Sequence, residues 1–152
     1  FTCKVVDMAT CAPSLFTALI HTEMGAWNAV ESALSEAGNA LTLGRFLVLR
    51  TVRDTPACRI QEVAASQGIT LGAASRLVDR LHRDGLLHRT PCEHDRRAII
   101  LTVTEEVLAH LEKACVIVET EQERLFAPLS TAQREELTRS LALIAEAAKE
   151  RA

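Results

Sequence analysis

The segment at 68–104 constrains the fold of this chain more than any other part of the sequence. A helix-sized block at 71–83 is followed by Gly85, and two short apolar runs then flank a polar segment that ends in the run Asp-Arg-Arg. The glycine marks the end of a helix, and the apolar runs around a polar turn predict a β-hairpin. A helix followed by a hairpin, with arginines on both, is typical of a winged helix-turn-helix, which binds duplex DNA.

A shorter helix is predicted immediately before this block, at 60–67, with Val63 and Ala64 facing inward. Gly68 suits the left-handed position that ends a helix, and Thr70 is a candidate N-cap for the next one. Helix, glycine turn and capped helix within about 25 residues form the helix-turn-helix pattern. Many helix pairs share this pattern, so the turn alone does not establish DNA binding.

The predicted helix at 71–83 has two faces. Its inward stripe consists of Ala74, Leu77, Val78 and Leu81. Its outward face, with the capped N-terminus at Thr70, offers groups that can approach base edges or clamp phosphates. These candidates are Ala73, Ser75, Arg76 and Arg80. The same spacing also fits an ordinary solvated face with Asp79 among the arginines, so this helix alone leaves both interpretations open.

A hairpin follows, with strands predicted at 86–89 and 98–104 and a polar loop at 90–97. Asp95 precedes Arg97 by two residues and can brace it in a tight loop. The braced arginine can then project into a minor groove or onto a phosphate. The alternative is a surface turn with a local ion pair, worth at most about 1 kcal/mol.

The rest of the chain is predicted to be helical, because alanine and leucine dominate and tyrosine is absent. Four further helices are predicted, at 13–37, 42–54, 104–126 and 130–148. Thr42 and Thr104 are candidate N-caps, and Ser130 with Gln133 forms a capping box. The predicted fold class is mainly α with a small β wing, a winged helix-turn-helix flanked by N- and C-terminal helices.

Charge is unevenly distributed along the 152 residues. The segment at 45–102 carries ten basic and six acidic residues, whereas the segments on either side are net acidic. A basic middle between acidic ends indicates one region that faces phosphate. The flanking helices hold more apolar surface than a compact winged domain needs. We therefore expect 41–103 to be the DNA-binding domain, and 1–40 with 104–152 to form a helical region that pairs with a second copy.

Other functional classes find little support in the sequence. No apolar run is long enough to span a bilayer, and the five cysteines are irregularly spaced, so we expect a cytoplasmic protein without a disulfide framework. No glycine-rich phosphate-binding loop, nucleophile elbow or metalloprotease motif is present, which argues against an enzyme. A winged-helix module that binds protein rather than DNA remains an alternative.

Two segments carry a resemblance to a known family. The sequences ASRLVDRLHRDGLLHR at 74–89 and HDRRAIILTVTEE at 94–106 closely resemble the MarR family of bacterial winged-helix regulators. The resemblance implies a homodimer that places two recognition helices in successive major grooves of a pseudo-palindromic operator, with the wings in flanking minor grooves. It assigns the major groove and its phosphates to Thr70, Ala73, Ser75, Arg76 and Arg80. It assigns the wing contacts to Arg96 and Arg97, with Asp95 as the brace.

The resemblance also implies control by an effector. Family members are usually repressors released by a small aromatic acid or phenol, or by cysteine oxidation. The family's ligand cleft would be lined here by Phe16, His21, Trp27, Phe46, Arg50 and His110. The alternative is a cysteine-oxidation sensor using Cys11, although the chain lacks the tyrosines that engage the reactive cysteine in the peroxide-sensing branch. No cofactor or metal site is expected.

Overall fold

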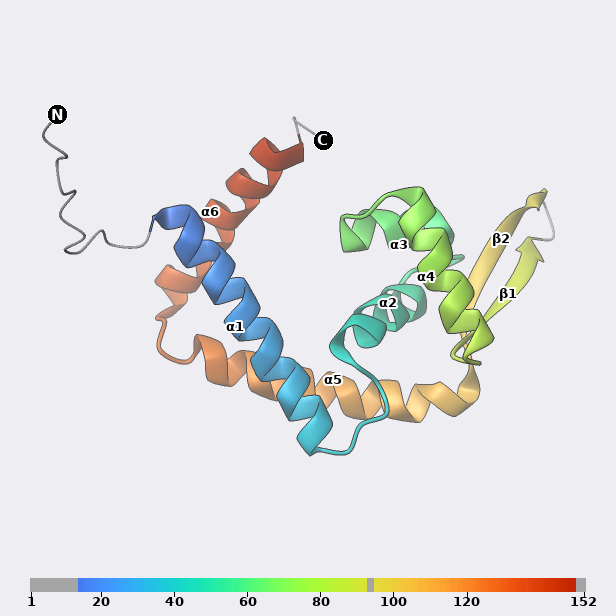
Figure 1. The fold of residues 1–152 in the computed structure, drawn as a ribbon, viewed down its shortest axis with the longest axis horizontal. Helices are drawn as coiled ribbons and strands as arrows, with labels where there is room; N and C mark the ends of the chain where they lie inside the picture. The colour runs from blue at the N-terminus through green and yellow to red at the C-terminus, as the bar shows by residue number, and fades with distance from the viewer. Residues whose placement is uncertain (1–13, 93–94, 150–152) are drawn as a thin grey trace, which may run out of the picture.

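The computed structural model describes residues 14–92 and 95–149, with the backbone alone for 95–97 and 149. These residues form six helices and one antiparallel hairpin (Figure 1). In chain order the elements are α1 Leu15–Glu36, α2 Leu43–Asp54, α3 Ile60–Gln67, α4 Leu71–Arg83, β1 Leu87–Cys92, β2 Asp95–Val103, α5 Glu105–Phe126 and α6 Thr131–Lys149. The predicted fold class, mainly α with a small β wing, is confirmed.

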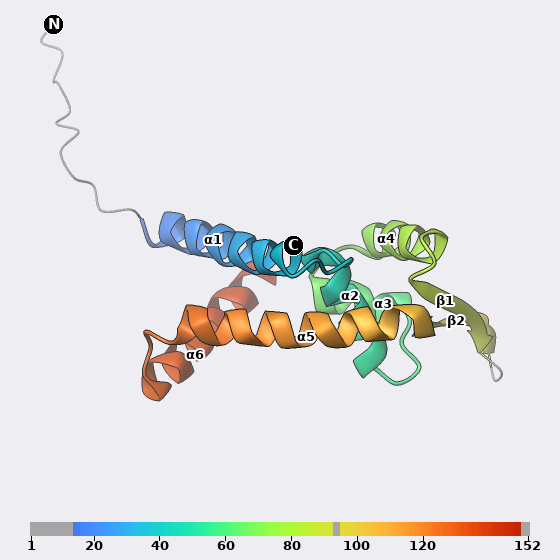
Figure 2. The ribbon, with the colours of Figure 1, turned by 90° about the horizontal axis from the view of Figure 1, so that it is seen from below.

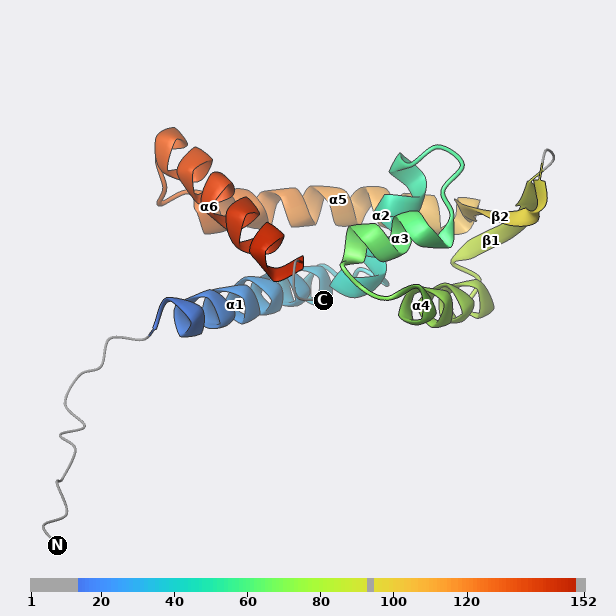
Figure 3. The ribbon, with the colours of Figure 1, turned by 90° about the horizontal axis from the view of Figure 1, so that it is seen from above.

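The long helix α5 forms the base of the molecule, and α1 lies alongside it (Figure 2). The hairpin and α4 lie toward the N-terminal end of α5, whereas α6 leaves from its C-terminal end (Figures 1 and 3). The division into a segment at 41–103 and flanking helices at 1–40 and 104–152 remains a prediction.

One continuous hydrophobic core holds α2, α3, α4 and the hairpin against α5. Its largest fully buried side chains include Phe46, Leu49, Val63, Val78, Leu81, Leu87, Leu101 and Leu111. The backbone N–H of Leu101 donates to the carbonyl of Cys58 at 2.8 Å, so the segment between α2 and α3 lies along β2. This core fixes the position of α4 relative to the hairpin.

The predicted helix signals are confirmed where they are local in sequence. Gly68 has a φ of 62° and ends α3, and the Thr70 hydroxyl accepts a hydrogen bond from the Ala73 amide at 3.3 Å. Ser130 and Gln133 exchange both bonds of a capping box. The helix α1 begins at Leu15, one residue after its cap Ser14; position 13, where the sequence predicts its start, lies outside the described residues.

The predicted hairpin boundaries are wrong. The sequence predicts strands at 86–89 and 98–104, with a loop at 90–97. In the structure β1 extends to Cys92 and β2 begins at Asp95. Polar side chains at the wing did not prevent strand formation, because the backbone groups pair across the hairpin, with Pro91 opposite Ile99 and Cys92 opposite Asp95 after a register shift.

Thr104 occupies the N-cap position of α5 as predicted, but its side chain does not cap the helix. The Thr104 hydroxyl instead donates to the carbonyl of Gly85 at 3.0 Å. Thr104 is buried, so its hydroxyl satisfies a backbone acceptor at the turn between α4 and β1. This bond connects the end of α4 to the start of α5.

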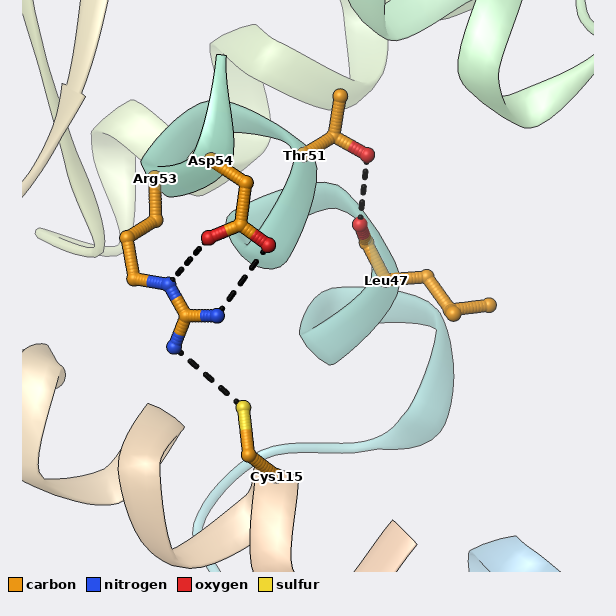
Figure 4. A network of polar contacts seen from close by, with 5 residues as sticks. All are labelled: Leu47, Thr51, Arg53, Asp54 and Cys115. Atoms are coloured by element: carbon orange, nitrogen blue, oxygen red, sulfur yellow. Dashed lines mark hydrogen bonds and ion pairs between the residues drawn. The ribbon is translucent and has the colours of Figure 1, made fainter. Parts of the chain in front are cut away.

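A polar network joins the end of α2 to the middle of α5 (Figure 4). Arg53 forms a two-pronged ion pair with Asp54, and its Nη1 donates to the Cys115 Sγ at 3.4 Å. The hydrogen bonds from the Arg53 guanidinium hold the pKa of the Asp54 carboxyl below its usual range. The network therefore joins the C-terminal end of α2 to α5.

Among the described helices, none combines the length and the apolarity that crossing a lipid bilayer requires.

Candidate nucleic-acid interface

The outward face of α4 concentrates exposed positive charge. Arg76, Arg80 and Arg83 are all exposed, and none forms an ion pair with another described side chain. Ala74, Val78 and Leu81 on the opposite face are buried, so core packing fixes which side of the helix faces solvent. Unpaired guanidinium groups on a packed helix are suited to bonding phosphates or guanine edges.

The N-terminal turn of α4 is low in bulk. Gly72 has open space where a side chain would lie, with only the Arg76 guanidinium nearby. Ala73 and Ser75 are half-buried, and Leu71 is exposed. With Thr70 as the cap, this turn offers backbone N–H groups and small side chains that can approach a groove floor.

The acidic residues around α4 are paired outside the helix. Asp79 forms an ion pair with Arg89 of β1 at 2.5 Å, and Asp84, the C-cap of α4, pairs with Arg45 of α2 at 2.6 Å. Neither Arg89 nor Arg45 is among the functional residues predicted from the sequence. A signal for Arg89 was available, because a charged residue within an apolar strand requires a partner when it is buried.

The wing tip lies at the far end of the hairpin from α5. Asp95, Arg96 and Arg97 are the first residues of β2, so the two predicted wing contacts and their predicted brace lie on one short piece of extended backbone. Their side chains lie outside the description, so the predicted brace between Asp95 and Arg97 remains a prediction.

The predicted effector residues are distributed over several elements. Phe16 and His21 are exposed on α1. Trp27 lines a shallow hollow of about 390 Å³ with Glu23, Met24 and Asn28, whereas His110 lines a separate hollow of about 400 Å³ beside the turn after α1. Trp27 and His110 therefore line two different hollows and do not share one.

Phe46 is a core residue and not part of an open cleft. Its side chain has no exposed surface, because it is packed within the core of the DNA-binding segment. The Arg50 guanidinium lies 5.5 Å from the centre of its ring, a cation–π contact that orients Arg50. A ligand could contact Arg50, which is half-buried, without reaching Phe46.

The cysteine proposed for oxidation sensing, Cys11, lies outside the described residues. Cys58 is buried, and burial, with a smaller contribution from the charge of Glu62, raises the pKa of its thiol to about 11. A thiol that stays protonated at neutral pH is a poor nucleophile, so Cys58 acts as a small core residue.

Comparisons with known proteins agree with this geometry. The family model described as "MarR family" matches residues 41–99. The HTH-type transcriptional regulator BilQ of Clostridium symbiosum is 30% identical over 107 residues, which cover 70% of this chain and 73% of BilQ.

Solved structures extend the likeness to most of the chain. The transcriptional repressor CouR bound to a 23-mer DNA duplex is 30% identical, with a TM-score of 0.75 over 86% of this chain and 92% of CouR. A MarR family protein of Mycobacterium tuberculosis in complex with p-aminosalicylic acid is 26% identical, with a TM-score of 0.61 over 88% of this chain and 99% of that one. The chain therefore belongs to the MarR family, whose members are DNA-binding transcriptional regulators and not enzymes.

Proposed function

We propose that this protein is a homodimeric repressor that binds a pseudo-palindromic operator and is released by a small aromatic or phenolic acid. In this proposal α4 enters the major groove and the hairpin reaches the adjacent minor groove. The residues that contact DNA are Thr70, Ala73, Ser75, Arg76, Arg80, Arg96 and Arg97, with Asp95 as the brace.

The observation that carries the DNA-binding mode is the outward face of α4. Arg76 and Arg80 are exposed without an acidic partner among the described side chains, one helical turn apart on that face. CouR, which resembles this chain over most of its length, is a repressor and was solved on a DNA duplex. Both facts support repression through direct operator binding.

Exposed apolar side chains on the flanking helices support a dimer. They gather on α1 and α6, which leave this surface uncovered in the single chain. The exposed residues assigned to this surface are Leu15, Phe16, Ile20, Met24, Trp27, Leu137, Leu141 and Ile144. Apolar surface of this extent on a small protein marks an interface, and a two-fold pairing of 1–40 and 104–152 would cover it. Such a dimer would present two copies of α4 to successive major grooves.

The operator can be obtained by selecting duplexes from a random pool with the wild-type protein. Arg76→Ala should weaken binding to the selected duplex by about 1–3 kcal/mol and weaken binding to random duplex less, because a base contact is lost together with charge. Arg139→Ala, which removes an exposed arginine of α6, is the matched control and should leave both affinities nearly unchanged. Equal losses on both duplexes would show that Arg76 contacts phosphate only, and no loss on either would contradict the placement of α4.

The effector part of the proposal can be tested through Trp27, the single tryptophan of the chain. A methyl group placed on Gly44 would lie 4.0 Å from the Trp27 ring, so the indole lies against the first turn of α2. Titration with 4-hydroxybenzoic acid should change Trp27 fluorescence over the same concentrations that release the operator. We propose that Arg50 binds the carboxylate of the acid, so Arg50→Gln should abolish both responses and preserve operator binding without the acid. Operator release that Arg50→Gln leaves unaltered would contradict this site.

A further inference from the structure

Asp79 lies where it could neutralise the arginines of α4. It is three residues after Arg76 and four before Arg83, and side chains at these spacings are neighbours on a helix surface. Yet its carboxylate is bonded to Arg89, which belongs to β1 and not to the helix. The three arginines of α4 are left without an acidic partner among the described side chains.

The position of Arg89 in the hairpin restricts where its side chain can reach. It stands opposite Leu101 in the hairpin register, and Leu101 is buried, so this position is on the core side of the hairpin. The Arg89 side chain is 26% exposed, against 45% for Asp79, and its Nε is buried with no hydrogen-bond partner among the described groups. The Arg89 guanidinium is therefore paired with Asp79, and it is poorly placed to contact DNA itself.

The same arrangement occurs a second time at the end of α4. Asp84 follows Arg80 by four residues and could pair with it, but Asp84 is bonded to Arg45 of α2 at 2.6 Å. Both carboxylates of α4 and its C-cap are thus neutralised by arginines from other elements.

We propose that Arg89 is a positioning residue that keeps the Asp79 carboxylate away from the DNA-binding arginines of α4. Without Arg89, Asp79 would turn to Arg76 or Arg83 and would also repel phosphate. Arg45 has the same role toward Asp84. This inference rests on the proposed contact of α4 with DNA, and it concerns a residue that makes no DNA contact of its own.

The role predicts an unequal effect of two single substitutions. Arg89→Gln frees the carboxylate, so it should weaken DNA binding and reduce the slope of log affinity against log salt by about 1 for each α4 on the DNA. Asp79→Asn removes the carboxylate, so it should not weaken binding. In the Asp79→Asn background the Arg89→Gln change should then have little effect, because there is no carboxylate left to release.

The experiment is a double-mutant cycle on the full-length protein, with affinity measured over a range of salt on a mixed-sequence duplex of about two to three helical turns. Arg124→Gln, which removes an exposed cation at the far end of α5, controls for the loss of one positive charge. A large loss from Arg89→Gln that disappears in the Asp79→Asn background supports the proposal. An equal loss in both backgrounds would overturn it, since that result indicates a simple charge effect or a direct DNA contact by Arg89.

A purely structural ion pair is also distinguishable, because it would make Asp79→Asn as harmful to DNA binding as Arg89→Gln. That outcome overturns the proposal even if Arg89→Gln folds poorly, since Asp79→Asn tests it independently. Arg76→Ala on the same duplex separates the two levels of inference. If Arg76→Ala has no effect on binding, the proposed contact of α4 with DNA is wrong. If Arg76→Ala weakens binding but Arg89→Gln and Asp79→Asn are not coupled, only the proposed role of Arg89 is wrong.

Discussion

Gly68 sits at the turn between α3 and α4 with a φ of 62°, a left-handed conformation that residues with a Cβ rarely adopt. Its amide donates to the carbonyl of Ala65, and the next amide, of Ile69, donates to that of Ala64. These bonds end α3 and direct the chain into Thr70, the cap of α4. One residue without a side chain thus sets the angle at which α4 leaves α3.

Gly68→Ala should lower the free energy of unfolding by about 1 kcal/mol, because alanine is strained at this φ. There is open space around the position, so backbone strain is the only cost. Gly72→Ala is the matched control: Gly72 is helical and also open, and alanine there should raise stability by about 0.5–1 kcal/mol. Urea unfolding of both variants measures the two signs, and a stabilising Gly68→Ala would contradict the role assigned to the turn.

At the scale of elements, α2 is the part that connects the interface to the rest of the molecule. Arg45 at its start bonds the C-cap of α4, and Arg53 at its end bonds Cys115 of α5. Phe46 and Leu49 between them are fully buried. Because α2 is held at both ends, it fixes the position of α4 relative to α5. The proposed dimer contacts depend on α5.

The hairpin shows what limits prediction at this scale. Alternation along β2 places Ile99, Leu101 and Val103 on one face of the strand, and all three belong to the core or pack against it. The extent of the strands was underestimated because polar residues at a wing tip pair through their backbones, which side-chain patterns do not register. The partner of Arg89 was missed for a related reason, since Asp79 is brought to it only when the hairpin packs under α4.

At the scale of the whole molecule, the helices that flank the DNA-binding segment have too little to pack against. Arg134 of α6 forms an ion pair with Glu123 of α5, and the apolar stripe of α6, formed by Leu137, Leu141 and Ile144, stays partly exposed. Val30 and Leu34 are the buried residues of α1, and its large exposed apolar side chains all lie nearer to its N-terminus. A second copy is the occupant that the proposed function requires.

Leu141→Glu should convert the protein from a dimer of twice 16.6 kDa to a monomer, because it places a charge within the apolar stripe of α6. Operator affinity should fall with it, since one α4 binds a single half-site. Light scattering after size-exclusion chromatography gives the mass. Leu143→Glu, outside the stripe and 74% exposed, is the control that should stay dimeric. A wild-type protein that runs as a monomer would contradict the dimer.

The sequence by itself determined the features that depend on neighbouring residues. Gly68, Thr70 and the Ser130–Gln133 box predicted helix ends correctly, because caps and turns are formed by groups a few residues apart. The outward arginines of α4 followed from helical periodicity for the same reason.

Only the tertiary structure decided which groups from distant segments meet. The Thr104 hydroxyl donates to the Gly85 carbonyl instead of capping α5, Phe46 is enclosed in the core, and Asp79 forms an ion pair with Arg89. Each outcome joins residues that lie on different elements, and their contact exists only after those elements pack. The arginines that α4 offers to DNA can therefore be predicted from the sequence. That the neighbouring carboxylates of Asp79 and Asp84 pair with arginines of other elements is decided only by the fold.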